Sequence, residues 1–307
     1  MADIVITEFM DEAAAASMPG SHYDPTLVDK PKELAAALSD ARAIVVRNRT
    51  QVTAELLESA PKLSCVGRLG VGLDNIDLDA CAARGVTVYP ATGANDLSVA
   101  EYVITTAMAL LRGAYIGSEQ VIAGKWPRQQ MSGRELAGKV MGLIGFGAIA
   151  REVALRAKLL GMEVLATDPH VMADDPAWQL ARNVSRDAVL ENSDVISLHV
   201  PLTDGTRHMI DEAALHGMRS DAIVINAARG GVVDEAALVA ALSAGRLGGA
   251  ALDVFEVEPV TAESGTMFAG VPNLIVTPHI AGVTQESNGR VSTLIAQRVR
   301  DHLAGLA

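Results

Sequence analysis

The chain has 307 residues, of which half are apolar and 3% aromatic, and its formal net charge is −12. This length allows a large core and favours two domains. The acidic balance argues against nucleic acid as a partner, because neutralising phosphates requires a basic face. No apolar run reaches bilayer length and the N-terminus lacks a signal sequence, so we expect a cytoplasmic protein with no membrane partner. Cys65 and Cys81 lack metal-binding spacing, and we expect no metal site.

The first part of the chain alternates short apolar strands with helices, which predicts an α/β domain around a parallel sheet. A Pro19-Gly20 pair keeps the first helix short. The strands are expected at 4–7, 43–46, 63–68 and 86–89, and the helices at 13–16, 35–38, 55–57 and 80–84.

A longer apolar helix is expected at 99–111, after the capping pair Asn95-Asp96, and it is long enough to link two domains. The next stretch, 113–136, fits neither alternating pattern and contains Trp126. This Trp either packs within a loop or belongs to a protruding arm that joins subunits. We favour the arm.

The second half of the chain repeats the strand and helix pattern and predicts a doubly wound sheet. A final helix at about 285–303 has no partner of its own there, so we expect it to fold back onto the first domain. The expected strands are 140–144, 163–167, 195–200, 223–226, 249–253 and 274–277, with helices at 187–191 and 235–244 between them.

A glycine motif, Gly145-Phe146-Gly147-Ala148-Ile149-Ala150, follows the apolar run 140–144 and precedes a helix. Gly145 can form the tight turn, Gly147 lets the backbone approach a pyrophosphate, and the small Ala150 lets the helix pack closely. The pyrophosphate would lie at the helix N-terminus. The next strand ends in Asp168, where a carboxylate binds both ribose hydroxyls and repels a 2′-phosphate. The pattern therefore predicts NAD, with Asp168 as a simple turn residue before Pro169 as the alternative.

Three polar residues follow strands of the predicted sheet. Arg229 follows 225–228, Glu258 lies past Asp253, and His279 follows Thr277. Taken alone, each could have a purely structural role, Arg229 as a surface cation, Glu258 as a turn residue and His279 as a loop histidine. Together they offer a cation for a carboxylate, an imidazole for proton transfer and a carboxylate to hold it, which is what hydride transfer between an alcohol and NAD requires.

Several long motifs, in order, resemble the D-isomer-specific 2-hydroxyacid dehydrogenase family, and most closely its phosphoglycerate dehydrogenase branch. The resemblance implies two Rossmann-like doubly wound α/β domains with a cleft between them, and a homodimer held by an arm at about 112–136. The substrate-binding domain would comprise 1–94 and 284–307, and the NAD-binding domain 95–283. The motifs run from Val46-Arg47-Asn48-Arg49-Thr50 through 67–77, the glycine motif and 226–235 to 251–259.

The resemblance also implies roles for single residues. Arg229 would bind the substrate carboxylate and the reacting oxygen, His279 would be the general acid and base, and Glu258 would orient it. The backbone of Gly70, Val71 and Gly72 would hold the carboxylate, and Asp253 would bind the nicotinamide amide. The full expected cofactor set is Val71, Gly145, Gly147, Ala148, Ile149, Asp168, His199, Val200, Pro201, Thr206, Ala227, Ala228, Arg229, Asp253, His279 and Gly282.

The sequence is compatible with several substrates. Arg47 and Arg68 end strands of the first domain and, with Arg49, can meet a second anion on the substrate, with surface salt bridges as the alternative. A phosphate as in 3-phosphoglycerate or a sulfonate as in 3-sulfolactate would satisfy them, and glycerate or lactate is the simpler alternative. Formate is disfavoured, since formate dehydrogenases of the same superfamily carry Gln where this chain has Glu258. A rival of another class is an NAD(H)-sensing, corepressor-like binding protein.

Overall fold

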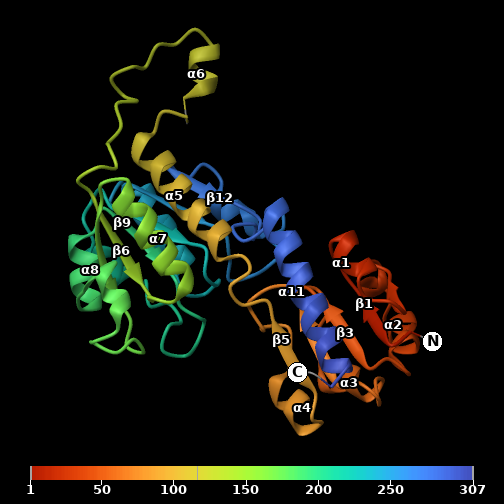
Figure 1. Cartoon of the computed structure of the whole chain (residues 1–307). Helices are drawn as coiled ribbons and strands as arrows, with labels where there is room; N and C mark the ends of the chain where they lie inside the picture. Colours follow the sequence, from red (N-terminus) through yellow and green to blue (C-terminus); the bar gives the residue numbers. More distant parts are fainter. Residues whose placement is uncertain (1, 116, 306–307) are drawn as a thin grey trace. The chain divides into compact units, whose positions relative to one another are not determined.

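The computed structural model of the chain describes residues 2–115 and 117–305. Met1, Ile116, Leu306 and Ala307, which fall within the expected first domain and arm, lie outside this described part. The chain forms two compact units (Figure 1). The first comprises Met1–Asn95 with Val283–Ala307, and the second comprises Asp96–Gly282.

The first unit contains a five-stranded, all-parallel sheet in the order β2-β1-β3-β4-β5, a doubly wound arrangement. The edge strand β2 was not predicted, because its residues are polar and only partly buried. The bounds are β1 Ile4–Ile6, β2 Ser21–Tyr23, β3 Ala43–Val46, β4 Cys65–Arg68 and β5 Thr87–Pro90.

Helices cover both faces of this sheet. The last helix of the chain, α11, packs on β4 and β5 of the first unit, as the sequence predicted. Gly67 allows this contact, because a Cβ there would lie 2.6 Å from Ile295 Cγ2. The elements are α1 Glu12–Ala16, η1 Leu27–Asp29, α2 Pro31–Leu38, α3 Ala54–Glu58, α4 Leu78–Ala83 and α11 Gln285–Leu303.

The second unit contains a seven-stranded parallel sheet in the order β12-β11-β10-β9-β6-β7-β8. Six strands match the prediction, and the seventh, β8, is a two-residue edge strand with exposed side chains. The chain order reverses at β6, between β7 and β9, which is the switch point where such sheets bind ligands. The bounds are β6 Val140–Ile144, β7 Glu163–Thr167, β8 Arg182–Asn183, β9 Val195–Leu198, β10 Ile223–Asn226, β11 Gly249–Leu252 and β12 Leu274–Val276.

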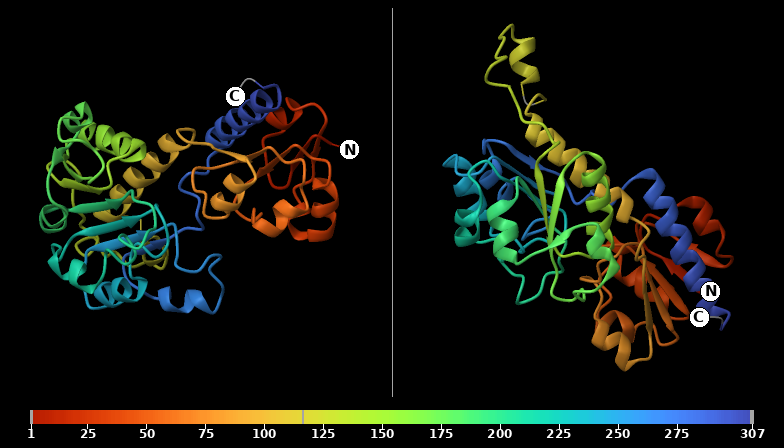
Figure 2. Two further views of the ribbon diagram at one scale, coloured as in Figure 1. Left: turned by 90° about the horizontal axis from the view of Figure 1, so that it is seen from below. Right: turned by 60° about the vertical axis from the view of Figure 1, so that its left-hand side comes forward.

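The helices of the second unit lie on both faces of its sheet (Figure 2). One core layer packs α5 and α7 against the sheet, and the other packs α8, α9 and α10. The elements are α5 Asp96–Arg112, α6 Ser118–Ile122, α7 Ala148–Leu159, η2 Pro176–Gln179, α8 Arg186–Asn192, α9 Glu212–Gly217, α10 Glu235–Ser243 and η3 Ser264–Phe268.

The segment after α5 stands clear of the sheet and helices of the second unit, with α6 at its tip (Figures 1 and 2). It exposes large apolar side chains: Tyr115 is 78%, Ile122 86% and Trp126 80% exposed. Its base is tied to the unit, since the Arg134 N–H donates to the Leu111 carbonyl at 2.8 Å.

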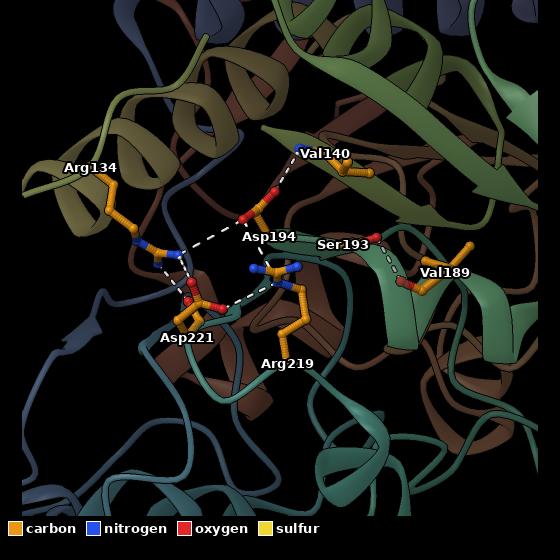
Figure 3. A network of polar contacts seen from close by, with 7 residues as sticks. All are labelled: Arg134, Val140, Val189, Ser193, Asp194, Arg219 and Asp221. Atoms are coloured by element: carbon orange, nitrogen blue, oxygen red, sulfur yellow. Dashed lines mark hydrogen bonds and ion pairs between the residues drawn. The ribbon is translucent and has the colours of Figure 1, made fainter. Parts of the chain in front are cut away.

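A network of charges at the base of this segment fixes Arg134 (Figure 3). Its guanidinium lies 2.7 Å from Asp221 Oδ2 and 3.9 Å from Asp194 Oδ1, and Arg219 approaches the same two carboxylates. Asp194 also accepts the Val140 N–H at 2.9 Å. The network therefore connects the protruding segment to the start of β6.

Candidate active site

The glycine turn has the geometry that a dinucleotide requires. Gly145 has a φ of +89°, and a Cβ there would lie 2.3 Å from the His199 carbonyl oxygen, so only glycine fits. Gly147 precedes α7, where no side chain caps the helix, and the space that a Cβ at Gly147 would fill is open. Ala150 is fully buried in the core layer of α5 and α7. The N-terminus of α7 can therefore receive a pyrophosphate.

Asp168 lies at the end of β7, next to the glycine turn. Its Oδ2 accepts the Phe146 N–H at 2.7 Å, and its Oδ1 accepts the His170 N–H at 2.8 Å. These bonds orient the carboxylate, and each oxygen keeps a lone pair for a further donor. The geometry fits the predicted role as a ribose ligand.

The other expected cofactor residues of the second unit also follow its strands. The strands are all parallel, so their carboxyl ends meet at one edge of the sheet. Thr206 is fixed there by donating from its hydroxyl to the Pro201 carbonyl at 2.6 Å. Helix α7 begins with Ala148 and Ile149, and the second unit ends at Gly282. Strand β9 is followed by His199, Val200 and Pro201, and β10 by Ala227 and Ala228. The first unit contributes Val71.

His279 and Glu258 are in direct contact. His279 Nδ1 lies 2.8 Å from Glu258 Oε2, and Glu258 Oε1 accepts the Phe255 N–H at 2.9 Å. A carboxylate can only accept, so Nδ1 carries a hydrogen and Nε2 is left for proton exchange. His279 has a φ of +55°, which is unusual for a non-glycine residue and typical of functional positions.

Glu258 is held in its charged form. Partial burial acts to raise its pKa, but the hydrogen bond from His279, the Phe255 N–H and the nearby charges of His279 and Arg229 outweigh it. The pKa of Glu258 is therefore below its ordinary value, and the carboxylate stays an acceptor for the imidazole.

The loop that carries Arg229 packs against the loop that carries Glu258, and the Arg229 charge is close enough to help lower the pKa of Glu258. A Cβ at Gly230 would lie 1.7 Å from the Phe255 carbonyl oxygen, so the Arg229 loop can pack against the Glu258 loop only because residue 230 is glycine. Asn226 fixes the Arg229 loop by donating to the Arg229 carbonyl at 2.9 Å and accepting the Ala228 N–H at 3.1 Å. The second unit thus brings Arg229, Glu258 and His279 together.

Asp253 holds the loop that carries His279, a role that the sequence did not reveal. It is 1% exposed. Its Oδ1 accepts from the Thr277 hydroxyl at 2.6 Å and from the Ile280 N–H at 2.9 Å, and its Oδ2 accepts the Ala281 N–H at 2.8 Å. Its expected contact with the nicotinamide amide stays a prediction.

The expected substrate residues of the first unit lie at the ends of β3 and β4 and in the loop after β4. Arg68 covers the Gly70 loop so closely that a Cβ at Gly70 would lie 1.6 Å from Arg68 Nη1. Arg47 follows β3, and its Nη2 donates to Asn288 Oδ1 at 2.8 Å. Arg49 forms an ion pair with Asp29, so its charge is already balanced.

The parallel sheet with a dinucleotide turn and the Arg-Glu-His cluster together define a nicotinamide-dependent oxidoreductase. Comparison with known proteins identifies the family. A sequence model described as "D-isomer specific 2-hydroxyacid dehydrogenase, NAD binding domain" matches residues 104–281. The chain belongs to the D-isomer-specific 2-hydroxyacid dehydrogenase family. It is accordingly an NAD-dependent oxidoreductase that interconverts a small 2-hydroxy acid and its 2-keto acid.

Three similar proteins illustrate the range of the family. A (S)-sulfolactate dehydrogenase of Chromohalobacter salexigens is 54% identical over 98% of both chains. A D-3-phosphoglycerate dehydrogenase of Archaeoglobus fulgidus is 42% identical over 90% of this chain and 52% of its own length. The crystal structure of a D-lactate dehydrogenase of Aquifex aeolicus with NAD and lactic acid has a TM-score of 0.83 and 29% identity, over 99% of this chain and 96% of that one.

Two further features concern the residues that the structure describes, 2–115 and 117–305. Among them, no group of three or more His, Cys, Asp or Glu side chains is arranged to hold a metal ion. Within the same ranges, no helix combines the length and the apolar character needed to cross a membrane.

His199 is expected to make the protein less stable in acid. Burial lowers its pKa to about 4 from 6.5. The unfolded chain then takes up a proton as the pH falls below 6.5, while the folded chain does so only near 4, so stability falls across this window. Between pH 7 and 5 the loss is on the order of 2 kcal/mol.

Thermal unfolding midpoints at pH 7 and 5 measure this effect in the cofactor-free protein. The His199→Gln variant should lose fewer degrees of Tm on acidification than the wild type, whereas His170→Gln, which changes an exposed histidine, should match the wild type. An equal drop in Tm between pH 7 and 5 in His199→Gln and in the wild type would show that His199 is not the source of the acid destabilisation.

Asp168 is expected to set the preference for NAD. Asp168→Ala should reduce kcat/KM for NAD by tenfold or more, since a charge-assisted bond contributes about 1.5–3 kcal/mol, and should change kcat/KM for NADP much less. Steady-state kinetics with both cofactors measures the ratio. Equal use of the two cofactors by the wild type would refute this role.

Proposed function

We propose that the substrate is a 2-hydroxy acid with a second anionic group on C3, and that the preferred group is a sulfonate, as in 3-sulfolactate. The observation that carries the proposal is the Arg47 guanidinium, which is held after β3 by the neutral amide of Asn288. A neutral partner orients the cation and leaves its charge for an anion. The similar (S)-sulfolactate dehydrogenase, at 54% identity, supports this choice of acid.

A sulfonate fits the local charge better than a phosphate monoester does. Arg47 lies beside the buried carboxylate of Glu8, and Arg49 is paired with Asp29. The nearby Glu8 carboxylate weakens the positive potential at Arg47 without forming an ion pair with it, and a weaker potential favours a singly charged group over a doubly charged one. 3-Phosphoglycerate is the second candidate, favoured by the similarity to phosphoglycerate dehydrogenases.

When bound at the glycine turn and Asp168, NAD would supply the hydride acceptor for C2 of the hydroxy acid, and NADH would supply the hydride in the reverse direction. Arg229 binds the substrate carboxylate and the oxygen on C2. His279 Nε2 takes the hydroxyl proton in oxidation and returns it in reduction, while Glu258 holds Nδ1 and stabilises the imidazolium. Asp253 keeps the His279 loop in place, and the backbone of Gly70, Val71 and Gly72 adds carboxylate donors.

The stereochemical descriptor of sulfolactate agrees with a D-specific enzyme. Sulfur gives the sulfonate-bearing carbon priority over the carboxylate, whereas in lactate the carboxylate ranks above the methyl group. (S)-Sulfolactate therefore has the same spatial arrangement as D-lactate, and one site can accept both.

Oxidation of pure enantiomers tests the proposal. NADH formation is expected from (S)-sulfolactate and not from (R)-sulfolactate, with a higher kcat/KM than for D-3-phosphoglycerate. A higher kcat/KM for D-3-phosphoglycerate than for (S)-sulfolactate would identify 3-phosphoglycerate as the preferred substrate. Activity on neither acid would reject the second-anion proposal.

We also propose that the first unit is the substrate-binding domain, that the second is the NAD-binding domain, and that the protein is a cytoplasmic homodimer. The segment 112–136 would join the subunits, because its apolar side chains are exposed and its base is fixed through Arg134.

A double substitution in this segment, Ile122→Ser with Trp126→Ser, is expected to raise the dimer dissociation constant by about a hundredfold or more, because burying each side chain contributes about 1.5–3 kcal/mol. Sedimentation equilibrium measures the constant. Leu159→Ser is the matched control, because Leu159 on α7 is also 80% exposed but lies outside the segment. A monomeric wild type, or equal dimer dissociation constants in the variant and the wild type, would reject the proposal that the segment 112–136 joins the subunits.

A further inference from the structure

The loop that presents Arg47 is built around one buried carboxylate. Glu8 follows β1 and is 5% exposed. Its Oε1 accepts the N–H groups of Arg47 at 2.8 Å and Thr50 at 2.9 Å. Its Oε2 accepts those of Arg49 at 3.1 Å and Asn48 at 3.3 Å. Four successive backbone donors therefore point at a single side chain.

These bonds keep Glu8 charged inside the unit. Burial acts to raise its pKa, but the N–H groups of Thr50, Arg47 and Arg49 and the Thr50 hydroxyl outweigh it, so the pKa of Glu8 lies below its ordinary value. A buried charge is costly unless it is fully hydrogen-bonded, and here it is. Asn75 holds the other side of the loop by donating to the Thr50 carbonyl at 2.7 Å.

The occupied donors have a consequence for ligand binding. Four converging N–H groups would otherwise form an anion site of their own. Because Glu8 fills it, a substrate anion at this loop must be recognised by side chains, and Arg47 supplies the cation. Burial lowers the pKa of Arg47 and the Glu8 charge opposes this, so Glu8 also favours the charged guanidinium.

The side chain of Arg47 is oriented from two directions. Asn288, on α11, accepts from Nη2 at 2.8 Å. The guanidinium carbon lies 5.8 Å from the centre of the Phe9 ring, the residue that follows Glu8. The loop backbone and the Arg47 side chain are thus fixed by separate residues, Glu8 for the first and Asn288 for the second.

We propose that Glu8 and Asn288 are positioning residues that determine the selectivity for a second anion on the substrate, by fixing the Arg47 loop and the Arg47 guanidinium. The proposal rests on the proposed function of Arg47. It adds residues from both ends of the chain to the determinants of substrate choice.

The experiment compares kcat/KM for 3-sulfopyruvate and for pyruvate, with NADH, in the wild type and in variants. Glu8→Gln replaces two acceptor lone pairs with an amide that faces N–H donors, and it should lower the sulfopyruvate-to-pyruvate ratio about tenfold. The change should fall mainly on KM rather than kcat. Glu8→Asp, which keeps the charge, should restore part of the ratio. Glu12→Gln, an exposed acid-to-amide change on α1, should have the wild-type ratio.

Asn288→Ala gives an independent test if Glu8→Gln fails to fold, because it removes the bond to Arg47 and leaves the loop backbone in place. It should also lower the ratio severalfold through KM. An unchanged sulfopyruvate-to-pyruvate ratio in Asn288→Ala, or equal losses on both acids in folded Glu8→Gln, would overturn the positioning role. If the wild type still prefers 3-sulfopyruvate in that case, the proposed function of Arg47 stands. A wild type with no preference would reject both.

Discussion

Replacing His279 with alanine is expected to lower kcat by about 10²- to 10⁴-fold, the usual contribution of a general acid or base. The reason is geometric: Glu258 holds Nδ1 at 2.8 Å, so Nε2 is the nitrogen available for the substrate proton. The dissociation constant of NADH should stay within a few-fold of the wild type, since the glycine turn and Asp168 are unchanged. Steady-state kinetics and a fluorescence titration with NADH provide the two measurements.

His22→Ala is the control for this prediction, because His22 is exposed in the first unit and should tolerate the change. A loss of only a few-fold in kcat for His279→Ala would remove His279 from the proton-transfer role. A large loss of NADH binding would show instead that the substitution disrupts the cofactor site.

Replacing Arg47 with alanine is expected to lower kcat/KM for the sulfonated acid by about thirtyfold relative to pyruvate, because one charge-assisted pair contributes about 2 kcal/mol. The bond to Asn288 and the contact with Phe9 orient the guanidinium in advance, so little entropy is lost when the anion binds. Initial rates with both keto acids measure the ratio.

Arg49→Ala is the matched control. Arg49 lies on the same loop, but its charge is paired with Asp29, so its removal should change the ratio much less. A larger effect at Arg49 than at Arg47 would show that Arg49 binds the second anion, although its charge is paired with Asp29.

The sequence predicted the architecture because buried parallel strands produce continuous apolar runs, as in β6 and β10. It placed Arg229, Glu258 and His279 after strands of the second unit, and the structure brings His279 and Glu258 into direct contact, while their catalytic roles stay a prediction. The edge strands β2 and β8 were missed, since short strands with partly exposed polar residues have no such pattern.

The residues that support the site were beyond sequence reasoning. Glu8 contacts a loop some forty positions away, and Asn288 contacts Arg47 from the opposite end of the chain. Only the pairing of β1 with β3 brings Glu8 and Arg47 to the same edge of the sheet. One signal was present, a charged residue just past the predicted strand 4–7, and it could have drawn attention to Glu8.

The most direct test of the central claim, that this dehydrogenase selects a 2-hydroxy or 2-keto acid with a second anion, is the kcat/KM of the wild type for 3-sulfopyruvate and for pyruvate, with NADH, at one pH and ionic strength. We predict a ratio of about thirty or more in favour of 3-sulfopyruvate, since one charge-assisted pair contributes about 2 kcal/mol. Equal kcat/KM for the two acids would contradict the claim.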